Sequence, residues 1–465
     1  MKAFTALLAA LATIDITSAA TGYLHKERST YTPSLGRRWS SNNPYVTVDG
    51  SVCTVKPMGG GQDDGPNLLY AFNLCGSTAL INLPGYYTVN TVLQTYLNNV
   101  EVRLTGAISY VPDIEYWSPA SIYLTYQNAT TYWFFRQAIT IYHESTKLTI
   151  LYSGSGITLH GGGTIDANGQ TWWDYYAQNK NAGVAGGSSR TFARPIPLTV
   201  GNASNVVVDD ISVINSPFWH NLVYQSTDVT YSNIQIRSIS SNESAEAANS
   251  DGWDIYRSSY VTIKDSNVQN GDDCVSFKPN STYMTVENMI CNGSHGISVG
   301  SLGQYAGETD IVANVYVRNI SMSNAQNGAR IKVFGGSNDT KSISGGGVGY
   351  VKNVTFQDFV NYNVDNPIYL TQCYSSSAQQ CQDHPSTLSI SDVYFINISG
   401  SASGLVPNNT VATLECSAEC VDITASGTQL SPKNGTVGSG KYLCANLQDE
   451  STLDFQCTDV PITKG

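Results

Sequence analysis

A short pattern recurs along the middle of the chain. It begins with Asn, Asp or Tyr. Two apolar residues follow, separated by one residue of any type, and after one more residue the pattern usually ends in Asn, Asp or Ser. The copies begin at Asn205, Asp228, Tyr260, Tyr283, Asn314, Asn353 and Asp392. One such unit is too small to bury its apolar face alone, so successive units must stack on one another. The repeat therefore predicts a solenoid.

Each copy reads as a short strand and is followed by a second alternating strand, as in HNLVYQS, DGWDIYRS and ARIKVF. Alternation with a period of two places one face in the core and the other in water. We therefore expect an all-β protein, a parallel β-helix. The alternative is a β-sandwich, which would need tight turn signals every 8–12 residues, and these are missing. The content of 41 Gly, 29 Tyr and only 13% charged residues also excludes a coiled coil or helical bundle.

One helix is expected near the start of the solenoid. In GGGQDDGPNLLYAFNLC, Asp63 or Asp64 is a candidate N-cap and Pro66 lies just inside the first turn. Such a helix could cover the open end of the solenoid, where exposed strand edges invite aggregation. Asp63 and Asp64 could instead form a catalytic pair, but the capping role is favoured.

The N-terminal residues indicate export. Residues 1–20 combine Lys2, an apolar run and small residues before a cleavage site, which is typical of a signal peptide. The run is too short to span a membrane. We expect residues 21–45 to be an N-terminal extension or propeptide and residues 46–465 to be a single catalytic domain. The net charge of -12 argues against nucleic-acid and membrane partners, although a local cationic site could still bind an anion.

Ten cysteines in an exported chain favour disulfides over metal ligands. Spacing does not fix their connectivity. The candidate pairs are Cys53/Cys75, Cys274/Cys291, Cys373/Cys381, Cys416/Cys420 and Cys444/Cys457. Glycosylation sequons also suit a secreted protein. The candidate sites are Asn128, Asn202, Asn242, Asn280, Asn319, Asn338, Asn353, Asn397, Asn408 and Asn434, whereas Asn292 lies close to His295 and is not expected to be used.

Polar residues that a bare scaffold would not need occur in neighbouring coils. They form the strings Asn249-Ser250-Asp251, Gly271-Asp272-Asp273, Ser294-His295-Gly296, Arg330-Ile331-Lys332 and Gln372-Cys373-Tyr374. Strands of adjacent coils lie about 4.8 Å apart, so residues at the same phase form a column. The sequence therefore predicts one patch of carboxylates, a histidine, two cations and a tyrosine.

Each member of this patch also has a structural interpretation. Asp272 and Asp273 could form a turn, but crowding of carboxylates would raise the pKa of one of them, as a general acid requires. His295 could be an ordinary packed residue. Arg330 and Lys332 alternate on one strand and face the same side, which suits either solvent or an anionic ligand.

Two further residues stay open on this evidence. Tyr374 could be a surface aromatic residue. Asp254 could be a fourth carboxylate of the site or a turn residue, and it is left unassigned. The neighbouring cysteines are interpreted as braces for the site.

The motifs NSD at Asn249, GDD at Gly271, SHG at Ser294 and RIK at Arg330, with Tyr374 downstream, resemble those of the polygalacturonases, family 28 of the glycoside hydrolases. The resemblance covers roughly residues 45–460. It implies a right-handed parallel β-helix that hydrolyses α-1,4 bonds between galacturonic acid units with inversion, and it implies no metal or cofactor.

The resemblance also assigns roles to individual residues. Asp272 is expected to be the general acid, while Asp251 and Asp273 are expected to activate the attacking water. His295 would tune the ionisation of the acid. Arg330, Lys332 and Tyr374 would hold the substrate carboxylate, for which a bidentate guanidinium and a point charge are suited.

The strings NSDGWDIYRSS and CNGSHGISVGSLGQY are most similar to fungal exo-polygalacturonases. Ser250 replaces the usual Thr, and Ser294 replaces the Gly typical of endo-acting members. Exo action requires a block beyond the terminal sugar. Two segments are candidates for it, the loop Phe334–Tyr350 and the aromatic segment Tyr110–Tyr142, whose Trp117, Tyr126, Trp133 and Phe135 could instead be buried strand residues.

Other functions remain possible from the sequence. An endo-polygalacturonase, an exo-rhamnogalacturonase and a xylogalacturonan hydrolase are the nearer alternatives. A calcium-dependent pectate lyase or a non-catalytic glycan-binding β-helix is more distant. We expect a secreted, extracellular monomer that acts on an acidic polysaccharide.

Overall fold

The computed structural model describes residues 43–137, 140–144, 147–151, 156–179 and 192–461. All of the elements below belong to one unit, Pro44–Gly465. The expected signal peptide and all but the end of the expected extension lie outside the described residues. None of the helices in the described ranges has the length and apolar character needed to cross a lipid bilayer.

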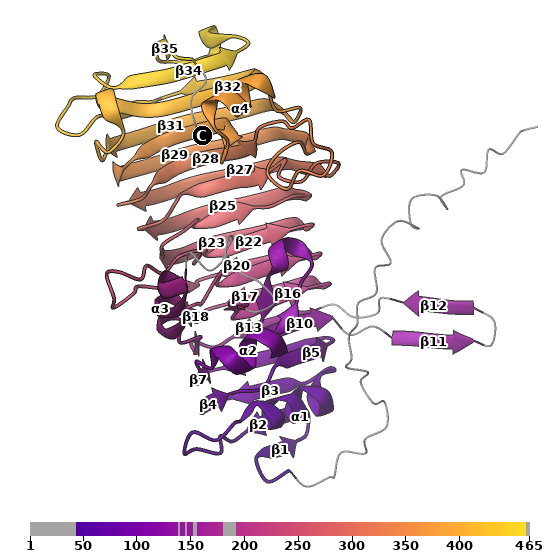
Figure 1. Ribbon diagram of the computed structural model, residues 1–465. Coiled ribbons are helices and arrows are strands. Elements are labelled where there is room, and N and C mark those ends of the chain that lie inside the picture. Colours follow the sequence, from indigo (N-terminus) through magenta and orange to yellow (C-terminus); the bar gives the residue numbers. More distant parts are fainter. Residues whose placement is uncertain (1–42, 138–139, 145–146, 152–155, 180–191, 462–465) are drawn as a thin grey trace, which may run out of the picture. The chain divides into compact units, whose positions relative to one another are not determined.

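The strands pair in parallel with those of the next coil, which confirms the right-handed parallel β-helix. Figure 1 shows the coils following one another in sequence order, from indigo to yellow. One ladder, here called the site ladder, carries the predicted functional residues. It consists of β5 (Leu93–Leu97), β10 (Trp133–Gln137), β16 (Leu198–Gly201), β19 (Asn221–Tyr224), β22 (Trp253–Tyr256), β24 (Val275–Phe277), β26 (Ile297–Leu302), β28 (Asn327–Phe334), β30 (Asn366–Tyr374), β32 (Thr410–Ser426), β34 (Lys441–Leu447) and β35 (Cys457–Asp459).

Two further ladders, here called the outer ladders, complete each coil. The first contains β2 (Val52–Val55), β3 (Leu80–Leu83), β6 (Val100–Leu104), β13 (Ile157–His160), β17 (Ser204–Asp209), β20 (Thr227–Ser232), β23 (Ser259–Gln269), β25 (Ser281–Asn292), β27 (Thr309–Ser323), β29 (Val348–Val364) and β31 (Ser389–Ala402). The second contains β4 (Tyr86–Val89), β7 (Ala107–Tyr110), β14 (Thr164–Asp166), β18 (Ser212–Ile214), β21 (Gln235–Arg237), the second halves of the long strands, and β33 (Gln429–Ser431). At the start, β1 (Val46–Asp49) pairs antiparallel with β2.

The remaining elements decorate the coils. The helices are α1 (Gly65–Cys75), α2 (Ile114–Ala120), α3 (Gln170–Asn179) and α4 (Ala378–Asp383). The strands β8 (Ile122–Tyr123), β9 (Thr130–Thr131) and β15 (Pro195–Ile196) form a small sheet, and β11 (Thr140–Glu144) pairs with β12 (Lys147–Leu151).

The ends of the repeated pattern are turns with left-handed backbone. Every copy begins with a residue at positive φ, between 53° and 60°. The last residue of each copy is also at positive φ, between 48° at Asp210 and 57° at Asn288. Asn and Asp tolerate this conformation better than other non-glycine residues. The Asn side chains then donate to the preceding coil, as when Asn319 Nδ2 donates to Asn288 Oδ1 at 2.7 Å.

The apolar positions of the repeat form columns inside the solenoid. Val206, Val229, Val261 and Met284 align in register on successive coils and are almost fully buried. The intervening residues face outward. This arrangement is the reason for the period of two, because only a stack of coils closes the core.

The predicted helix over the first coils is confirmed as α1, with Leu68 and Phe72 in the core. Asp64 occupies the N-cap position, but its side chain makes no capping bond. It accepts instead from the backbone N–H groups of Met58 and Thr88. Asp63 accepts from the N–H of Gly65. Both carboxylates therefore fix the loops at this end of the solenoid, and the catalytic alternative for them is wrong.

All five candidate disulfide pairs are formed. They are Cys53–Cys75, Cys274–Cys291, Cys373–Cys381, Cys416–Cys420 and Cys444–Cys457. The second joins the residue after Asp273 to β25, and the third joins the residue before Tyr374 to α4, which agrees with their interpretation as braces.

Candidate active site

The outward residues of the site ladder form columns because its strands pair in register. Asp254 of β22, Ser298 of β26, Arg330 of β28 and Tyr369 of β30 belong to one column. Asp251, Asp273 and His295 each lie two residues before a strand of this ladder, on three successive coils. The equal phase of these turns is what makes the side chains converge.

Three carboxylates meet at these turns. Asp251, Asp272 and Asp273 each place an oxygen within 4.8 Å of the others. Their exposure differs: the side chain of Asp272 is 16% exposed, whereas those of Asp251 and Asp273 are 4% and 0% exposed. Asp272 is therefore the carboxylate that a ligand can reach most directly.

Asp273 is held by cations from β28. Lys332 Nζ lies 2.5 Å from its Oδ2, and Arg330 Nη1 lies 3.6 Å from its Oδ1. Ser298 also donates to Oδ1 at 2.7 Å. The ring of Tyr374 lies next to both cations, with its centroid 5.5 Å from Arg330 Cζ and 5.6 Å from Lys332 Nζ.

Asp272 pairs with His295. The Nδ1 atom of His295 lies 3.1 Å from Asp272 Oδ1. Asn249 Nδ2 donates to Asp272 Oδ2 at 3.4 Å, and the backbone N–H of Asp273 donates to Oδ1 at 2.8 Å. The structure thus brings together all seven residues singled out from the sequence.

The ionisation of the carboxylates differs from the simplest expectation. Burial opposes the charge of Asp272, but the charge and the hydrogen bond of His295 outweigh it and lower the pKa of Asp272. Burial also opposes the charge of His295, and Asp272 raises the pKa of that imidazole in return. Within the trio, the raised pKa instead belongs to Asp251, because of its burial and its proximity to Asp254 and Asp272. These shifts favour a proton on His295 and on Asp251 over one on Asp272.

Asp254 is not a turn residue. It lies within β22, is fully buried and pairs with Lys278, whose Nζ is 2.9 Å from its Oδ1. Lys278 Nζ is also 4.0 Å from Asp251 Oδ2 and 5.2 Å from the ring centroid of Trp219. Sequence reasoning missed Lys278, although it directly follows β24 at the same phase as Gly300 and Lys332. That phase was the available signal.

Two buried residues behind the turns were also missed. The N–H and Nδ1 of His220 both lie close to the Asp251 carbonyl, at 2.8 and 3.0 Å, and its Nε2 faces Ser238 Oγ at 2.8 Å. Burial lowers the pKa of His220 to about 4. The guanidinium of Arg194 reaches Asn249 Oδ1 at 2.7 Å. No motif marks either residue in the sequence.

The site ladder is partly covered, at β19 and β22, by residues 122–131, here called the end segment. Its Leu124, Tyr126 and Ala129 pack in a hydrophobic cluster with outward residues of β19 and β22, including Leu222 and Tyr256. The rings of Tyr126 and Tyr256 stack with centroids 3.9 Å apart. The outward column is therefore covered directly before the coil that carries Asp254.

The end segment also joins a second loop. Gln127 Nε2 donates to Gln304 Oε1 at 3.2 Å, and the N–H of Gly345 donates to the Gln304 carbonyl at 2.7 Å. Gly345 belongs to the predicted blocking loop Phe334–Tyr350. The two segments that the sequence suggested as blocks beyond the terminal sugar thus both contact Gln304.

The aromatic segment divides into two parts. Trp117, Trp133 and Phe135 are fully buried in the main core, so the buried interpretation holds for them. Tyr126 packs outside the core, over the site ladder. Tyr142 lies outside the residues whose side chains are described.

The carboxylate trio has donor atoms close enough together to hold a cation. However, Asp273 already faces Lys332 and Arg330, and Asp272 faces His295. A divalent ion would have to displace these positive charges, so the donor set fits a proton-transfer site better than a metal site.

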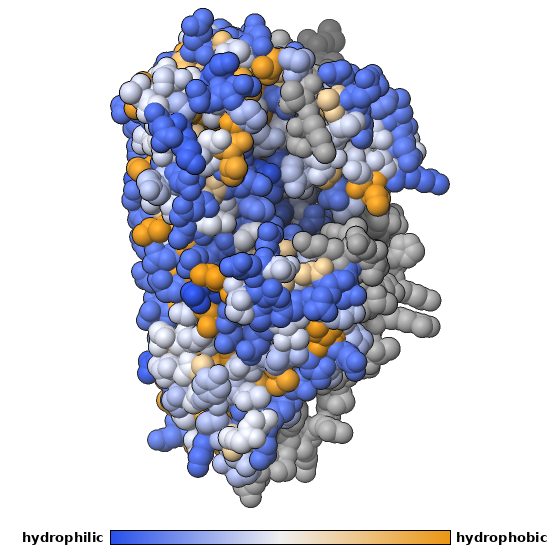
Figure 2. Space-filling model, turned by 60° about the vertical axis from the view of Figure 1, so that its left-hand side comes forward, coloured by the Kyte–Doolittle hydropathy of each residue, from blue (hydrophilic) through white to orange (hydrophobic). Residues whose placement is uncertain are grey.

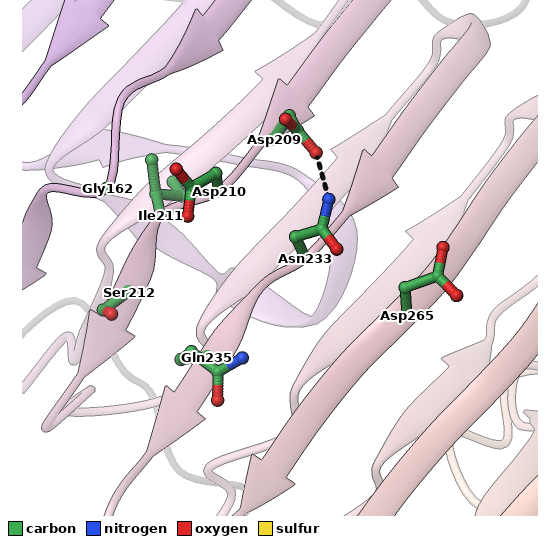
Figure 3. Close-up of a pocket in the computed structure, with 8 residues that line it drawn as sticks. All are labelled: Gly162, Asp209, Asp210, Ile211, Ser212, Asn233, Gln235 and Asp265. Carbon is green, nitrogen blue, oxygen red and sulfur yellow. Dashed lines mark hydrogen bonds between the residues drawn. The ribbon is translucent and has the colours of Figure 1, made fainter.

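Two hollows on the surface of the described residues lie on the outer ladders, away from these side chains. One of about 400 Å³ is lined by turn residues of the outer ladders, among them Asp209, Asn233 and Asp265 (Figure 3). There Asp209 accepts from Asn233, one of the bonds that link successive coils. Figure 2 shows a surface dominated by hydrophilic residues, with hydrophobic ones in small separate groups. Such a face suits a hydrated ligand better than an apolar partner.

Comparison with known proteins agrees with the fold and the motifs. Residues 122–452 match the family model described as glycosyl hydrolases family 28. The chain is 40% identical over 442 residues to the probable exopolygalacturonase X of Neosartorya fischeri. The matched region covers 92% of this chain and 94% of that protein. It is 41% identical over 406 residues to the exopolygalacturonase of Cochliobolus carbonum, covering 85% and 84%.

A solved structure gives the same result. The endo-xylogalacturonan hydrolase of Aspergillus tubingensis is 30% identical and superposes with a TM-score of 0.75, covering 89% of this chain and 100% of that one. The extent of the family match and the identity to these relatives together place the protein in family 28 of the glycosyl hydrolases, as a glycoside hydrolase.

Proposed function

We propose that this chain is an exo-acting polygalacturonase. It removes galacturonic acid from the end of α-1,4-linked polygalacturonate by hydrolysis with inversion. The observation that carries this proposal is the convergence of three carboxylates, a histidine and two cations on successive coils, directly beside the end segment. The relatives named exopolygalacturonases support the substrate and the mode of cleavage.

Asp272 is the general acid in this mechanism. Its carboxyl is the most exposed of the three, so the leaving glycosidic oxygen can approach it. Asp272 raises the pKa of His295, which favours a proton on the imidazole, and His295 Nδ1 lies 3.1 Å from Asp272 Oδ1. Transfer of that proton to Asp272 leaves the charge of the pair unchanged and prepares the acid. His295 therefore acts as the proton store that tunes Asp272.

Asp273 and Asp251 position the attacking water. Burial opposes the charge of Asp273, but Lys332 and Arg330 keep its pKa low, so it is an ionised base. Asp251 lies beside it and can hydrogen-bond the same water. Arg330, Lys332 and Tyr374 surround the place where the substrate carboxylate would lie, since they supply charge and an aromatic face on the same coils.

The stereochemistry comes from the family and not from the spacing. Inverting glycosidases usually separate their two carboxyl groups by about 6.5–9.5 Å, whereas oxygens of this trio lie within 4.8 Å of one another. Proton NMR during early hydrolysis tests the proposal. The β anomer of galacturonic acid should appear first, and first appearance of the α anomer would contradict inversion.

Exo action follows from the end segment. Because Tyr126 and its neighbours cover Leu222 and Tyr256, a polymer cannot continue along the ladder past Asp254. Chromatography of early products on polygalacturonate is the direct test. Galacturonic acid alone supports the proposal, and early trimers or longer oligomers contradict it. Unsaturated products would indicate a lyase.

Xylogalacturonan hydrolysis is the second candidate. The specific observation in its favour is the solved relative that matches at 30% identity over 89% of this chain. Parallel digestion of polygalacturonate and xylogalacturonan separates the two. Faster release from the unsubstituted polymer is expected, because the relatives named exopolygalacturonases match this chain at 40–41% identity.

We also infer that the protein is a secreted, extracellular monomer, with residues 1–20 as the signal peptide, residues 21–45 as an extension or propeptide and the rest as one domain. Five disulfides support an oxidising compartment. Among the sequons, Asn338, Asn408 and Asn434 are exposed on loops and are the expected glycan carriers. By contrast, Asn353 and Asn397 use Nδ2 to bond the preceding coil. N-terminal sequencing and glycopeptide mass spectrometry test these assignments.

A further inference from the structure

Arg194 is a fully buried cation that lies outside the four motifs NSD, GDD, SHG and RIK. It lies directly before β15 and reaches two later coils. Its Nη1 donates to the carbonyls of Pro217 and Ala248, at 3.2 and 2.9 Å, and its Nη2 donates to Asn249 Oδ1 at 2.7 Å. Burial lowers its pKa to about 10, which leaves the guanidinium charged at any pH at which a pectin-degrading enzyme would work.

The geometry points to a function for this contact, and we propose that Arg194 is a positioning residue for the general acid, acting through Asn249. A guanidinium has donors and no acceptor, so only the oxygen of the Asn249 amide can face it. The amide nitrogen must then point the other way, where it donates to Asp272 Oδ2 at 3.4 Å. Arg194 therefore determines that the amide nitrogen of Asn249, and not its oxygen, faces Asp272.

The surroundings hold Arg194 in this position. Its Cζ lies 4.3 Å from the ring centroid of Tyr176 on α3 and 4.9 Å from that of Phe218. The backbone of Asn249 has a φ of +57°, so the residue sits on a turn that Arg194 fixes through the Ala248 carbonyl. Both the orientation of the amide and the position of its backbone therefore depend on one buried side chain.

The consequence for catalysis concerns the charge on Asp272. When the acid gives up its proton, the resulting carboxylate is stabilised by donors aimed at it. His295, the Asp273 N–H and Asn249 are those donors. A reversed amide would present oxygen to Asp272 and would oppose its ionisation. This inference rests on the proposed role of Asp272 as the general acid.

The first test separates the two halves of the amide. Asn249→Asp keeps an acceptor for Arg194 and removes the donor to Asp272. We expect the midpoint temperature of unfolding to be unchanged or higher, while kcat falls about tenfold and KM changes less than about twofold. The basic limb of the kcat–pH profile should move to higher pH, because loss of a donor to the carboxylate raises its pKa. An unchanged kcat with an unchanged profile would overturn the proposal.

The second test is a double-mutant cycle of Arg194→Lys and Asn249→Ala. If Arg194 acts through Asn249, each single variant loses about tenfold in kcat and the double variant loses no more than Asn249→Ala alone. Multiplicative losses would show that Arg194 acts by another route. Trp173→Phe is the matched control, because it removes a nearby buried hydrogen bond, to the Ser216 carbonyl, without touching Asn249. It should lower the midpoint temperature and leave kcat unchanged.

The cycle remains informative if Arg194→Lys folds poorly, because Asn249→Asp leaves Arg194 in place. Wild-type protein is assayed in parallel for release of galacturonic acid from polygalacturonate. Absence of that activity would count against the proposed function, whereas wild-type activity with an additive cycle would count against the role of Arg194 alone.

Discussion

Two consecutive strands of the chain, β28 on the site ladder and β29 on the outer ladders, differ in the solvent exposure of their residues. All eight residues of Asn327–Phe334 are buried, although Arg330 and Lys332 are among them. In Val348–Val364, buried residues are separated by half-buried and exposed ones. Outer-ladder polar residues are solvated, whereas those on the site ladder are satisfied mainly by one another. Replacing a side chain should therefore matter far more on the site ladder.

The largest difference in activity between the two ladders is expected when an aspartate is replaced. Asp272→Asn removes the proposed general acid, and general acid–base groups contribute about 10²–10⁴-fold to rate. We expect release of galacturonic acid to fall by about 10³-fold with an unchanged circular dichroism spectrum. The matched variant is Asp265→Asn on the outer ladders, whose carboxylate accepts from Asn288. Its activity should equal that of the wild type, and equal losses in both variants would remove the proposed distinction between the ladders.

The next largest effect is expected for lysine. Lys332→Met leaves Asp273 with one of its two close cations, and breaking a buried ion pair costs about 3 kcal/mol of the free energy of unfolding. Denaturant unfolding should show this loss, and KM for polygalacturonate should rise. Lys264→Met is the control, because its pair with Asp265 is about 40% exposed on both sides. The Lys264→Met variant should have the same free energy of unfolding as the wild type. A Lys332→Met variant as stable as the wild type would mean that the charge of Asp273 is compensated without Lys332.

A smaller, pH-dependent effect is expected at Asp254. Burial, aided by Asp273 and opposed by Lys278, raises its pKa to about 7, whereas an unfolded chain ionises Asp near 4. Between these values the folded protein holds a proton that the unfolded chain has lost. The contribution of Asp254 to stability is therefore present below about pH 4 and is lost as pH rises to about 7.

Asp254→Asn removes this titration. The fall in the free energy of unfolding between pH 4.5 and pH 7 should be smaller in the variant than in the wild type. Asp272 and Asp273 act in the opposite direction, since their lowered pKa values make stability fall on acidification below about pH 4. If the free energy of unfolding depends on pH identically in the variant and the wild type, a group other than Asp254 takes up the proton on folding.

The smallest effect is expected on the outer ladders. Tyr260 stands at a turn with a φ of 56°, where most copies of the repeat have Asn or Asp. Tyr260→Asn should relieve backbone strain but lose the stacking of Tyr260 on Tyr283, whose ring centroids lie 4.8 Å apart. These effects are of similar size and opposite sign, so the free energy of unfolding should change by less than about 1 kcal/mol. A change of several kcal/mol would show that the exposed stack holds the coils together.

The sequence by itself determined the solenoid, because period-two strands and left-handed Asn and Asp turns are local properties of each repeat. It also determined the convergence of Asp251, Asp273 and His295, since equal phase on successive coils fixes their register. The short cysteine separations likewise indicated the five disulfide pairs, although spacing alone left other pairings open.

Only the tertiary structure decided what depends on contacts between distant parts of the chain. It placed Tyr126 over β19 and β22, paired Lys278 with Asp254, and aimed Arg194 at Asn249. It also gave the raised pKa to Asp251 and not to Asp272, because burial and charge partners set ionisation. Phase along the chain is encoded by neighbouring residues, whereas burial and the orientation of an amide are set by side chains tens of residues away.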